Sequence, residues 1–387
     1  MFYTEEKAIL GYYLLKNILV FFGGVSQEHD VSVLTGVFTL NCLDPAQYNA
    51  VPVYIARDGC WFTGDEMRKI SFFKDFDEKK VSRVTLLSGS DGLFDVKGNR
   101  LKKLLIAYCA INCLHGRNGE DGSLSGVLRL SGIPSASPDI FSLAASLDKT
   151  KTKVMLDGAK IPSAPYESVT AERFFSARNE VIDGLKERLS LPVIVKPSSS
   201  GSSIGISVAK TETELAAALD KAFRFDNSCL VESYLPSATD VNCAAFRRDG
   251  RIVVSECERP FSHGEFLSFD DKYSSSKYGA AKEFPAKIDL SVSDEIKSLT
   301  KKVYELFGFT GVVRVDYLLS GGKVYLNEIN GVPGSLAYYL FCDKIADFSV
   351  MLDELVKEGV RAYSSYTNCS FEYGSDILSF KGVALKK

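Results

Sequence analysis

The chain has 387 residues, of which 25% are charged and 45% hydrophobic, which predicts a soluble globular protein of two or three domains. A net charge of −3 excludes an extended nucleic-acid-binding surface, and no apolar run is long enough to span a membrane. Nine cysteines without a Cys-x-x-Cys pair, and no recognisable signal peptide, predict reduced thiols and a cytoplasmic location.

The first predicted domain opens as an α/β unit. Residues 16–24 are a buried-strand run that ends in two glycines, residues 31–40 have helical spacing, and residues 48–56 read as a second strand. In such units ligands bind at the carboxyl ends of the strands. The glycines do not complete a G-x-G-x-x-G motif, so the sequence does not predict a dinucleotide-binding site.

A loop rich in glycine and charge follows the next expected strand. The strand is predicted over residues 104–114, and the loop occupies residues 115–122. Binding loops are often placed directly after a buried strand, although a purely structural loop is the alternative. A helix at 123–130 and a Pro/Ser-rich stretch at 134–138 then close a first domain of residues 1–138.

A central domain is expected over residues 139–235. Its elements are predicted, in chain order, as a helix at 142–156, strands at 191–197 and 206–210, a helix at 212–224 and a strand at 229–235. The Ser/Gly loop at 198–205 is not a Walker A motif, because no Gly-Lys-Ser/Thr opens a helix. Its backbone N–H groups and hydroxyls could still close over phosphates beside Lys196, and a plain linker is the alternative.

The last predicted domain, residues 236–387, contains a hairpin around Asp249-Gly250 and then a polar segment at 263–287. Loops of that length inside a compact domain are usually functional lids or disordered. Helices are expected at 291–307 and 348–358.

A hairpin near the end of the chain carries the strongest chemical signal. Arg314 and Asp316 interrupt an apolar strand at i and i+2, so they project from the same face. After a Ser-Gly-Gly turn, the returning strand brings Glu328 and Asn330 to the facing position with the same spacing. These oxygen donors suit Mg²⁺, which completes its coordination with phosphate and water. Solvated charges on an exposed hairpin are the alternative, but both strands are too apolar to face water.

Several of these stretches occur together, in the same order, in one known family. The chain resembles D-alanine–D-alanine ligases and, more broadly, ATP-grasp carboxylate–amine ligases. The matching stretches, which together run from about residue 17 to 357, are Phe22-Gly23-Gly24 with 28–32, the loop 115–122, Asp148-Lys149, 193–197 with 201–205, Asp271-Lys272-Tyr273, Arg314-Val315-Asp316, and 327–330 with Pro333-Gly334.

The resemblance implies a fold of mixed α/β and α+β class. A Rossmann-like, pre-ATP-grasp domain (1–138) that binds substrate would precede two α+β subdomains (139–235 and 236–387) that grip ATP. The residues implied to bind ATP are Lys149 and Lys196 for the phosphates, Glu232 and Leu235 for adenine and Asp240 for ribose, together with Ser203 and Lys272. Those implied to hold two Mg²⁺ ions, with Mn²⁺ as an alternative, are Asp316, Glu328 and Asn330.

The resemblance also implies the chemistry, which forms a peptidoglycan precursor. The carboxylate of one D-alanine attacks the γ-phosphate of ATP, and the amine of a second D-alanine then displaces phosphate from the acyl phosphate. Arg314 and the backbone N–H of Gly334 would stabilise the oxyanion. Glu28 would receive the first substrate's ammonium.

Three further residues complete the implied site. Ser202 and Tyr273 would tie the lid closed, which protects the acyl phosphate from water. His115 would lie near the reacting groups, with a purely structural core histidine as the alternative. The implied partners are D-alanine, ATP and a second copy of the chain in a homodimer, with no nucleic acid and no membrane.

Some positions depart from the family pattern. Ser200 replaces a common acidic residue, and Asp240 replaces a commoner glutamate. More important is the segment 335–341, where many relatives have threonine and serine residues that hold the second substrate's carboxylate; Ser335 is a candidate substitute. Tyr273 favours D-alanine over D-lactate as acceptor. A ligase for D-serine or another acceptor is therefore an alternative. A nucleotide-binding regulator without catalysis is a third, against which the intact Arg314 hairpin argues.

Overall fold

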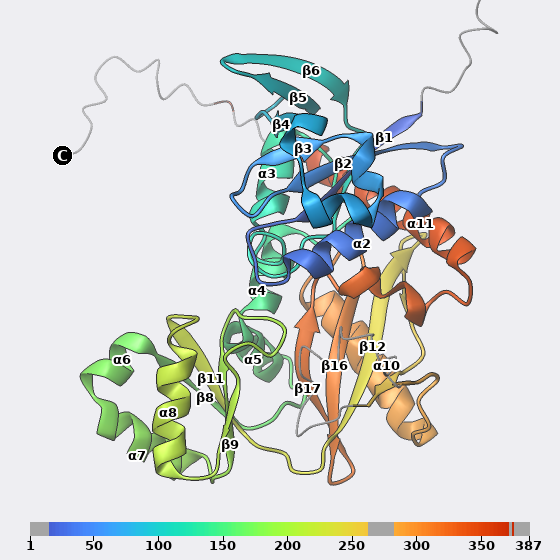
Figure 1. The fold of residues 1–387 in the computed structure, drawn as a ribbon. Coiled ribbons are helices and arrows are strands. Elements are labelled where there is room, and N and C mark those ends of the chain that lie inside the picture. Colours follow the sequence, from blue (N-terminus) through green and yellow to red (C-terminus); the bar gives the residue numbers. More distant parts are fainter. Residues whose placement is uncertain (1–14, 262–281, 371–373, 375–387) are drawn as a thin grey trace, which may run out of the picture.

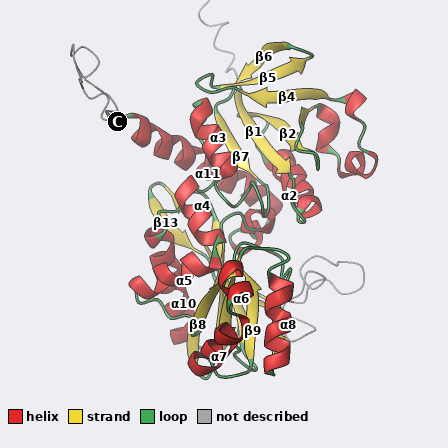
Figure 2. Cartoon of the chain, turned by 90° about the vertical axis from the view of Figure 1, so that its left-hand side faces the viewer, coloured by secondary structure: helices red, strands yellow, loops and turns green. Residues whose placement is uncertain are grey.

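The computed structural model describes residues 15–261, 282–370 and 374. It consists of three larger sheets with helices packed against them, which Figures 1 and 2 show from two directions. The lid residues Lys272 and Tyr273 lie outside the described residues. Among the described helices, none has the length and apolar character that crossing a membrane requires.

The first sheet has seven strands, with a parallel part around β1 and an antiparallel extension beyond β2. In sheet order the strands are β6 (Arg100–Ile106), β5 (Gly92–Lys97), β4 (Ser82–Leu86), β3 (Trp61–Thr63), β2 (Tyr48–Ile55), β1 (Lys16–Gly23) and β7 (Cys109–Asn112). Short 3₁₀ turns lie between β3 and β4, at η1 (Asp65–Arg68), η2 (Ile70–Asp75) and η3 (Glu78–Lys80).

Alternate residues of β1 bury opposite faces of this sheet. Ile18 and Val20 share a core with α2 (His29–Cys42) and α11 (Ile345–Thr367), whereas Leu19 and Phe21 share a core with α3 (Ser123–Ser131). A strand with period-two side chains and helices on both sides has two buried faces, which explains why its sequence is a continuous apolar run. The predicted α/β class is confirmed.

The strand predicted over residues 104–114 is wrong as a single element. It is split into the end of β6 and the separate strand β7, because the chain leaves one edge of the sheet and re-enters on the far side of β1. The Tyr108 N–H donates to the Asn17 carbonyl at 2.9 Å at this crossing. The preceding region, residues 64–103, for which no strand was predicted, contains β4, β5 and most of β6.

The second sheet is antiparallel, and its helices cover one face in a core of their own. Its strands, in sheet order, are β10 (Ser207–Ala209), β9 (Val193–Pro197), β11 (Ser228–Ser233) and β8 (Tyr166–Thr170). The helices are α6 (Ala171–Ser176), α7 (Arg178–Arg188) and α8 (Glu212–Ala222). Strands β9, β10 and β11 and helix α8 were predicted from the sequence, whereas β8, α6 and α7 were not.

The third sheet is also antiparallel and carries the Arg314 hairpin. Its strands, in sheet order, are β13 (Arg251–Val254), β12 (Thr239–Arg248), β16 (Val313–Ser320) and β17 (Lys323–Asn330), and a small ribbon of β14 (Arg259–Pro260) and β15 (Lys282–Glu283) lies nearby. Helix α10 (Leu290–Leu306) packs on the face opposite the hairpin's polar side chains, in a core that also holds Tyr317.

The helix predicted over residues 142–156 is interrupted. It consists of α4 (Ile140–Leu147) and α5 (Lys149–Gly158), separated by Asp148 in an extended conformation. The Asp148 side chain accepts hydrogen bonds from the backbone N–H groups of Thr150 and Lys151, so it caps the start of α5. The break changes the direction of the chain between α4 and α5, and α5 begins at Lys149.

The last helix, α11, returns to the first sheet. It follows η4 (Gly334–Leu340) in sequence, and its buried residues lie in the same core as β1 and α2. In Figure 1 this red helix lies beside the blue α2, far from the green second sheet. It begins and ends outside the predicted range of 348–358. The domain boundaries at 138 and 235 stay predictions.

Candidate active site

One cavity of about 650 Å³ brings together residues from the second and third sheets and, beside the first sheet, from α2 and the loop after β7. Every predicted site residue that the structure describes lines it: Glu28, His115, Lys149, Lys196, Ser202, Ser203, Glu232, Leu235, Asp240, Arg314, Asp316, Glu328, Asn330 and Gly334. The two remaining predictions, Lys272 and Tyr273, fall in the undescribed range. Residues more than 300 positions apart in sequence therefore share one hollow.

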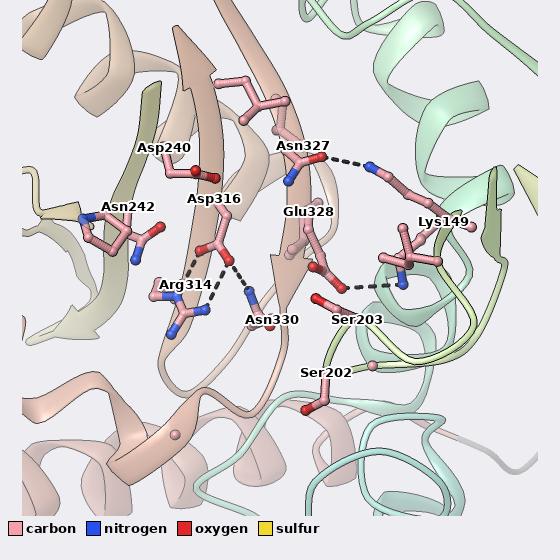
Figure 3. Close-up of a pocket in the computed structure, with 18 of the residues that line it drawn as sticks. Lys149, Ser202, Ser203, Asp240, Asn242, Arg314, Asp316, Asn327, Glu328 and Asn330 are labelled. Atoms are coloured by element: carbon pink, nitrogen blue, oxygen red, sulfur yellow. Dashed lines mark hydrogen bonds and ion pairs between the residues drawn. The ribbon is translucent and has the colours of Figure 1, made fainter. Parts of the chain in front are cut away.

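The hairpin β16–β17 forms one wall of this cavity, as predicted. Asp316 pairs directly with Glu328, and Arg314 with Asn330. Arg314 binds Asp316 through two hydrogen bonds, Nε to Oδ1 at 2.7 Å and Nη2 to Oδ2 at 2.9 Å, and Asn330 Nδ2 donates to the same carboxylate at 3.0 Å. Figure 3 shows these side chains on one face of the hairpin. Burial disfavours the charged Arg314, but Asp316 outweighs it and raises the Arg314 pKa well above its ordinary value.

Lys149, at the start of α5, faces the hairpin from the opposite wall (Figure 3). Its ammonium lies 3.2 Å from Glu328 Oε1 and donates to the Ser200 carbonyl at 2.7 Å. Ser200 belongs to the Ser/Gly loop, so this one cation links the loop to the acidic hairpin. The Asp148 cap fixes the backbone from which Lys149 extends.

A buried charge cluster lies between α5 and the second sheet. Glu232 contacts two ammoniums, Lys153 through Oε1 and Lys196 through Oε2 at 2.5 Å, and Lys196 also donates to Asn327 Oδ1 at 2.8 Å. Burial alone would raise the pKa of Glu232, but Lys196 and Lys153 outweigh it and hold this pKa at about 2. Burial lowers the pKa of Lys153 despite the nearby carboxylate.

Lys153 supports the site through Glu232 without lining the cavity, and it was not predicted from the sequence. A stretch with as many charges as residues 148–153 is usually solvated, but Lys153 is 1% exposed. It lies four residues after Lys149, so both ammoniums emerge from the same face of α5. This spacing from Lys149 is the sequence feature from which Lys153 could have been predicted.

The first sheet's loops close the other end of the cavity. Ser202 donates a hydrogen bond to Glu28 Oε1, which joins the Ser/Gly loop to the start of α2. Ser202 and Ser203 both have positive φ, 50° and 60°, so the loop turns sharply here. Tyr273, which the resemblance implies closes the lid together with Ser202, lies outside the described residues.

His115 is buried and its tautomer follows from its neighbours. Nδ1 lies 2.8 Å from the Val332 carbonyl, which only accepts, so Nδ1 carries the proton. Nε2 then accepts from the Thr35 hydroxyl at 3.0 Å, and Thr35 Oγ1 accepts from the Ser335 N–H at 3.1 Å. Burial lowers the pKa of His115, which keeps this neutral form.

Glu120 is a second residue whose position in the site was not anticipated. Its two carboxyl oxygens accept from the Gly116 N–H at 2.7 Å and the Val332 N–H at 3.2 Å, so it joins the loop after β7 to the loop after β17. Burial and then the Glu28 carboxylate raise its pKa. Glu120 belongs to the predicted loop 115–122, but the Val332 N–H that it binds lies 212 positions away in the sequence.

The donor set on the hairpin can be compared with what metal ions require. Within the described residues no three His, Cys, Asp or Glu side chains form a metal-binding group. The candidate ligands are instead two opposed carboxylates, Asp316 and Glu328, and the Asn330 amide. Mg²⁺ usually keeps several non-protein ligands. A site with a small number of protein oxygens beside a cavity of phosphate size therefore suits Mg²⁺ better than a closed cage of protein ligands would.

Two family models match the chain, the D-ala D-ala ligase N-terminus over residues 17–138 and the D-ala D-ala ligase C-terminus over residues 155–360. The chain is 34% identical to a D-alanine–D-alanine ligase of Thermosipho melanesiensis, an alignment that covers 94% of this chain and 99% of the relative. A D-alanine–D-alanine ligase structure from Helicobacter pylori matches with 27% identity and a TM-score of 0.71, covering 89% of this chain and 98% of that one. The Coxiella burnetii structure matches in fold with a TM-score of 0.76 at 24% identity, covering 91% and 96%.

Proposed function

The chain belongs to the D-alanine–D-alanine ligase family, and from that membership we propose that this enzyme joins two D-alanines to D-alanyl-D-alanine, a peptidoglycan precursor, at the expense of ATP. The observation that carries the proposal is the single cavity into which every described candidate residue of the family site projects. The substrates are thus small molecules, with ATP as the energy source.

We propose that ATP lies between the second and third sheets. Lys149 and Lys196 reach the cavity from opposite elements, α5 and β9, and would bind phosphates, with Ser203 of the Ser/Gly loop and Lys272 beside them. The cluster of Lys153, Lys196 and Glu232 supports this, because it holds Lys196 in a fixed position. Glu232 and Leu235 would contact adenine, and Asp240 the ribose; all three line the cavity.

Asp316, Glu328 and Asn330 would hold two Mg²⁺ ions, or Mn²⁺ in their place. Bound there, the ions would neutralise charge on the transferring phosphoryl group. Lys149, now 3.2 Å from Glu328, is placed to move its contact to a phosphate once the carboxylate has another cation. Arg314 meanwhile orients the Asp316 carboxylate through its two hydrogen bonds.

The reaction then follows from where the charges lie. Glu28 would bind the first D-alanine's ammonium and direct its carboxylate toward the γ-phosphate; the new oxygen–phosphorus bond forms as ADP leaves. The second D-alanine's amine attacks the acyl carbon, and Arg314 with the Gly334 N–H would stabilise the resulting oxyanion. Phosphate leaves with its bonding pair, and the amine loses its proton.

His115 would act as a positioning residue. Its neutral ring links Thr35 on α2 to the Val332 carbonyl just before Gly334, so it fixes the backbone that supplies the Gly334 N–H. Ser202 would close the Ser/Gly loop over Glu28, and Tyr273 would complete that closure.

Purified protein with ATP, Mg²⁺ and D-alanine tests the proposal. We expect ADP, phosphate and D-alanyl-D-alanine in equal amounts, identified by mass. Phosphate release that requires D-serine or another added acceptor would instead favour a mixed ligase, the alternative raised by the unusual segment 335–341. ATP binding without any phosphate release would favour a non-catalytic regulator. Light scattering and cell fractionation would test the expected homodimer and cytoplasmic location.

A further inference from the structure

Two cysteines face each other in the third sheet, behind the wall of the cavity. Asn242 on β12 and Glu258 form an antiparallel pair in which each N–H donates to the other's carbonyl, at 2.8 and 2.9 Å. The next residues along the two segments, Cys243 and Cys257, are therefore opposite each other at a position where the two backbones do not bond to each other. Residues so paired have Cα atoms about 4.5 Å apart and side chains on one face, which a disulfide can span. Both thiols are free.

A hydrogen bond between the two thiols makes them unequal. This hydrogen bond lowers the pKa of the Cys257 thiol and raises the pKa of the Cys243 thiol. The Ser293 hydroxyl, 3.7 Å from Cys257 Sγ, also lowers the pKa of Cys257. Cys257 therefore has the greater thiolate character of the two, and the thiolate is the form of cysteine that reacts with oxidants.

The pair lies just below the surface of the protein. Cys243 is 0% exposed and Cys257 is 1% exposed, but the side chain of Glu256, which directly precedes Cys257, is 54% exposed. The hydroxyls of Ser255 and Ser293 lie 3.8 and 3.7 Å from the two sulfurs, so the surroundings of the thiols are partly polar. A small polar oxidant such as hydrogen peroxide therefore needs only a local opening of the chain to reach Cys257.

We propose that Cys243 and Cys257 form a dithiol that hydrogen peroxide oxidises to a disulfide, with Cys257 reacting first. The Cys257 thiolate attacks one peroxide oxygen, the O–O bond breaks and hydroxide leaves, so that a sulfenic acid forms. The Cys243 sulfur then attacks the Cys257 sulfur; the S–S bond forms, the S–O bond breaks, and the hydroxyl leaves as water with the Cys243 proton. The two sulfurs have together lost two electrons, which reduce the peroxide. Cys243 thereby protects Cys257 from irreversible oxidation to a sulfinic acid.

The disulfide joins two segments that carry residues of the cavity. Cys243 is opposite Val315 on β16, and both lie in the core that α10 covers. Asn242 and Glu258, the neighbours of the two cysteines, line the cavity, and Asn242 Nδ2 donates to Glu258 Oε2 at 3.3 Å. Asn242 is opposite Asp316 in the sheet, and Figure 3 shows both side chains. Oxidation therefore fixes this wall from behind without filling the cavity, and the inference does not depend on the proposed function.

Peroxide treatment of the folded wild-type protein, followed by alkylation, trypsin digestion and mass spectrometry, tests the proposal. Trypsin cleaves after Arg247, Arg248 and Arg251, so the two cysteines leave on separate peptides unless a disulfide joins them. Cys229 is the internal control, because it is equally buried and burial raises its pKa to about 12. We expect linked peptides that lack two hydrogen atoms and separate with dithiothreitol, and modification of Cys229 that is at least ~10-fold slower.

Two serine variants separate the roles of the two thiols. Cys243→Ser keeps a hydroxyl donor beside Cys257 but cannot form the disulfide, so dimedone should trap a sulfenic acid on Cys257. In Cys257→Ser, Cys243 should stay a thiol over the same interval, because the thiol form of Cys243 reacts slowly. Thermal melts show whether each variant is folded, and the wild-type measurement depends on neither.

Peroxide treatment in denaturing urea shows whether the fold brings the thiols together. We expect the preference for the Cys243–Cys257 pair to disappear there, since all nine cysteines are then accessible. Linked peptides that form equally fast in urea would overturn the proposal, because closeness in sequence would then explain them. Wild-type protein that gives no linked peptides, or that loses Cys229 at the same rate, would also overturn it. Dimedone labelling of Cys243 in place of Cys257 would overturn the order of the two steps.

Discussion

Glu328 lies where the acidic hairpin meets Lys149. It is opposite Asp316 on the paired strand and 3.2 Å from the Lys149 ammonium. Two facing carboxylates repel each other unless cations neutralise them, and in this structure Arg314 and Lys149 do so. When ATP is bound, the proposed ions would take over that task. The charge of this one side chain is therefore central to phosphoryl transfer.

Replacing Glu328 by Gln should lower kcat for phosphate release at least ~100-fold, because one charged oxygen ligand of the proposed ions is lost. Glu256→Gln is the matched control, since Glu256 pairs with Lys297 and its side chain is 54% exposed. The assay is phosphate release under saturating ATP and D-alanine. Equal activity of Glu328→Gln and the wild type would contradict the role given to the hairpin.

The hairpin residues of the cavity could be predicted from their local spacing, whereas most of the other predicted site residues followed only from the family resemblance. Arg314, Asp316, Glu328 and Asn330 alternate along two apolar strands, a pattern that places them on one face. Lys153 could not be assigned in the same way. Its partner, Glu232, lies on another element, and only the tertiary fold shows that the ammonium is buried.

At the scale of secondary-structure elements, helix caps and charge clusters determine where the walls of the cavity lie. Asp148 is both the break between α4 and α5 and the cap of α5. The sequence pattern of residues 142–156 stays helical across this break, because periodicity does not register a change of helix direction. In the same way, the continuous apolar pattern of residues 104–114 does not show where β6 ends and β7 begins.

Removing the Asp148 cap should destabilise the protein by about 1 kcal/mol and raise the KM for ATP, because two backbone N–H groups lose their acceptor and Lys149 loses its fixed origin. Asp289→Ala is a matched control, since Asp289 precedes α10 without a capping hydrogen bond from its side chain. Urea unfolding and ATP kinetics of Asp148→Ala and Asp289→Ala provide the comparison. Identical effects of the two substitutions would show that the cap does not matter.

The buried Glu232 predicts a stability that depends on pH. Glu232→Gln leaves two buried ammoniums with one neutral acceptor, and we expect a loss of about 3 kcal/mol at pH 7. The folded-state pKa is about 2, below the ordinary 4.5, so the carboxylate stabilises the fold above pH 4.5 and this contribution is lost as the pH falls toward 2. Wild type and variant should therefore converge in unfolding free energy across that range. A difference that is constant with pH would contradict the cluster.

For the whole molecule, α11 determines how the first sheet and the catalytic hairpin are joined. The helix follows η4 directly after the hairpin strand β17, and its buried face lies in the core of the first sheet. Tyr48 on β2 donates to Asp353 Oδ1 at 2.5 Å across this contact. The two ends of the described chain thus share one core, so they should unfold together.

Leu352→Ala on α11 should destabilise the first sheet by about 2–5 kcal/mol, since Leu352 is 0% exposed in this shared core. Trp61, the only tryptophan of the chain, packs on Phe21 at 5.3 Å between ring centroids and reports on that sheet. Its fluorescence during urea unfolding should shift to a lower midpoint. Val350→Ala, at a position 58% exposed on the same helix, should leave the midpoint nearly unchanged. An unshifted Trp61 transition in Leu352→Ala would mean that the two parts unfold independently.

The central claim is that the assembled cavity ligates D-alanine through an acyl phosphate. D-Alanine with both carboxylate oxygens labelled as ¹⁸O, incubated with ATP, Mg²⁺ and the protein, tests it most directly by mass spectrometry of the products. We predict D-alanyl-D-alanine together with phosphate that carries one labelled oxygen, because the donor carboxylate oxygen leaves attached to phosphorus. Dipeptide formation with unlabelled phosphate, or phosphate release without dipeptide, would contradict it.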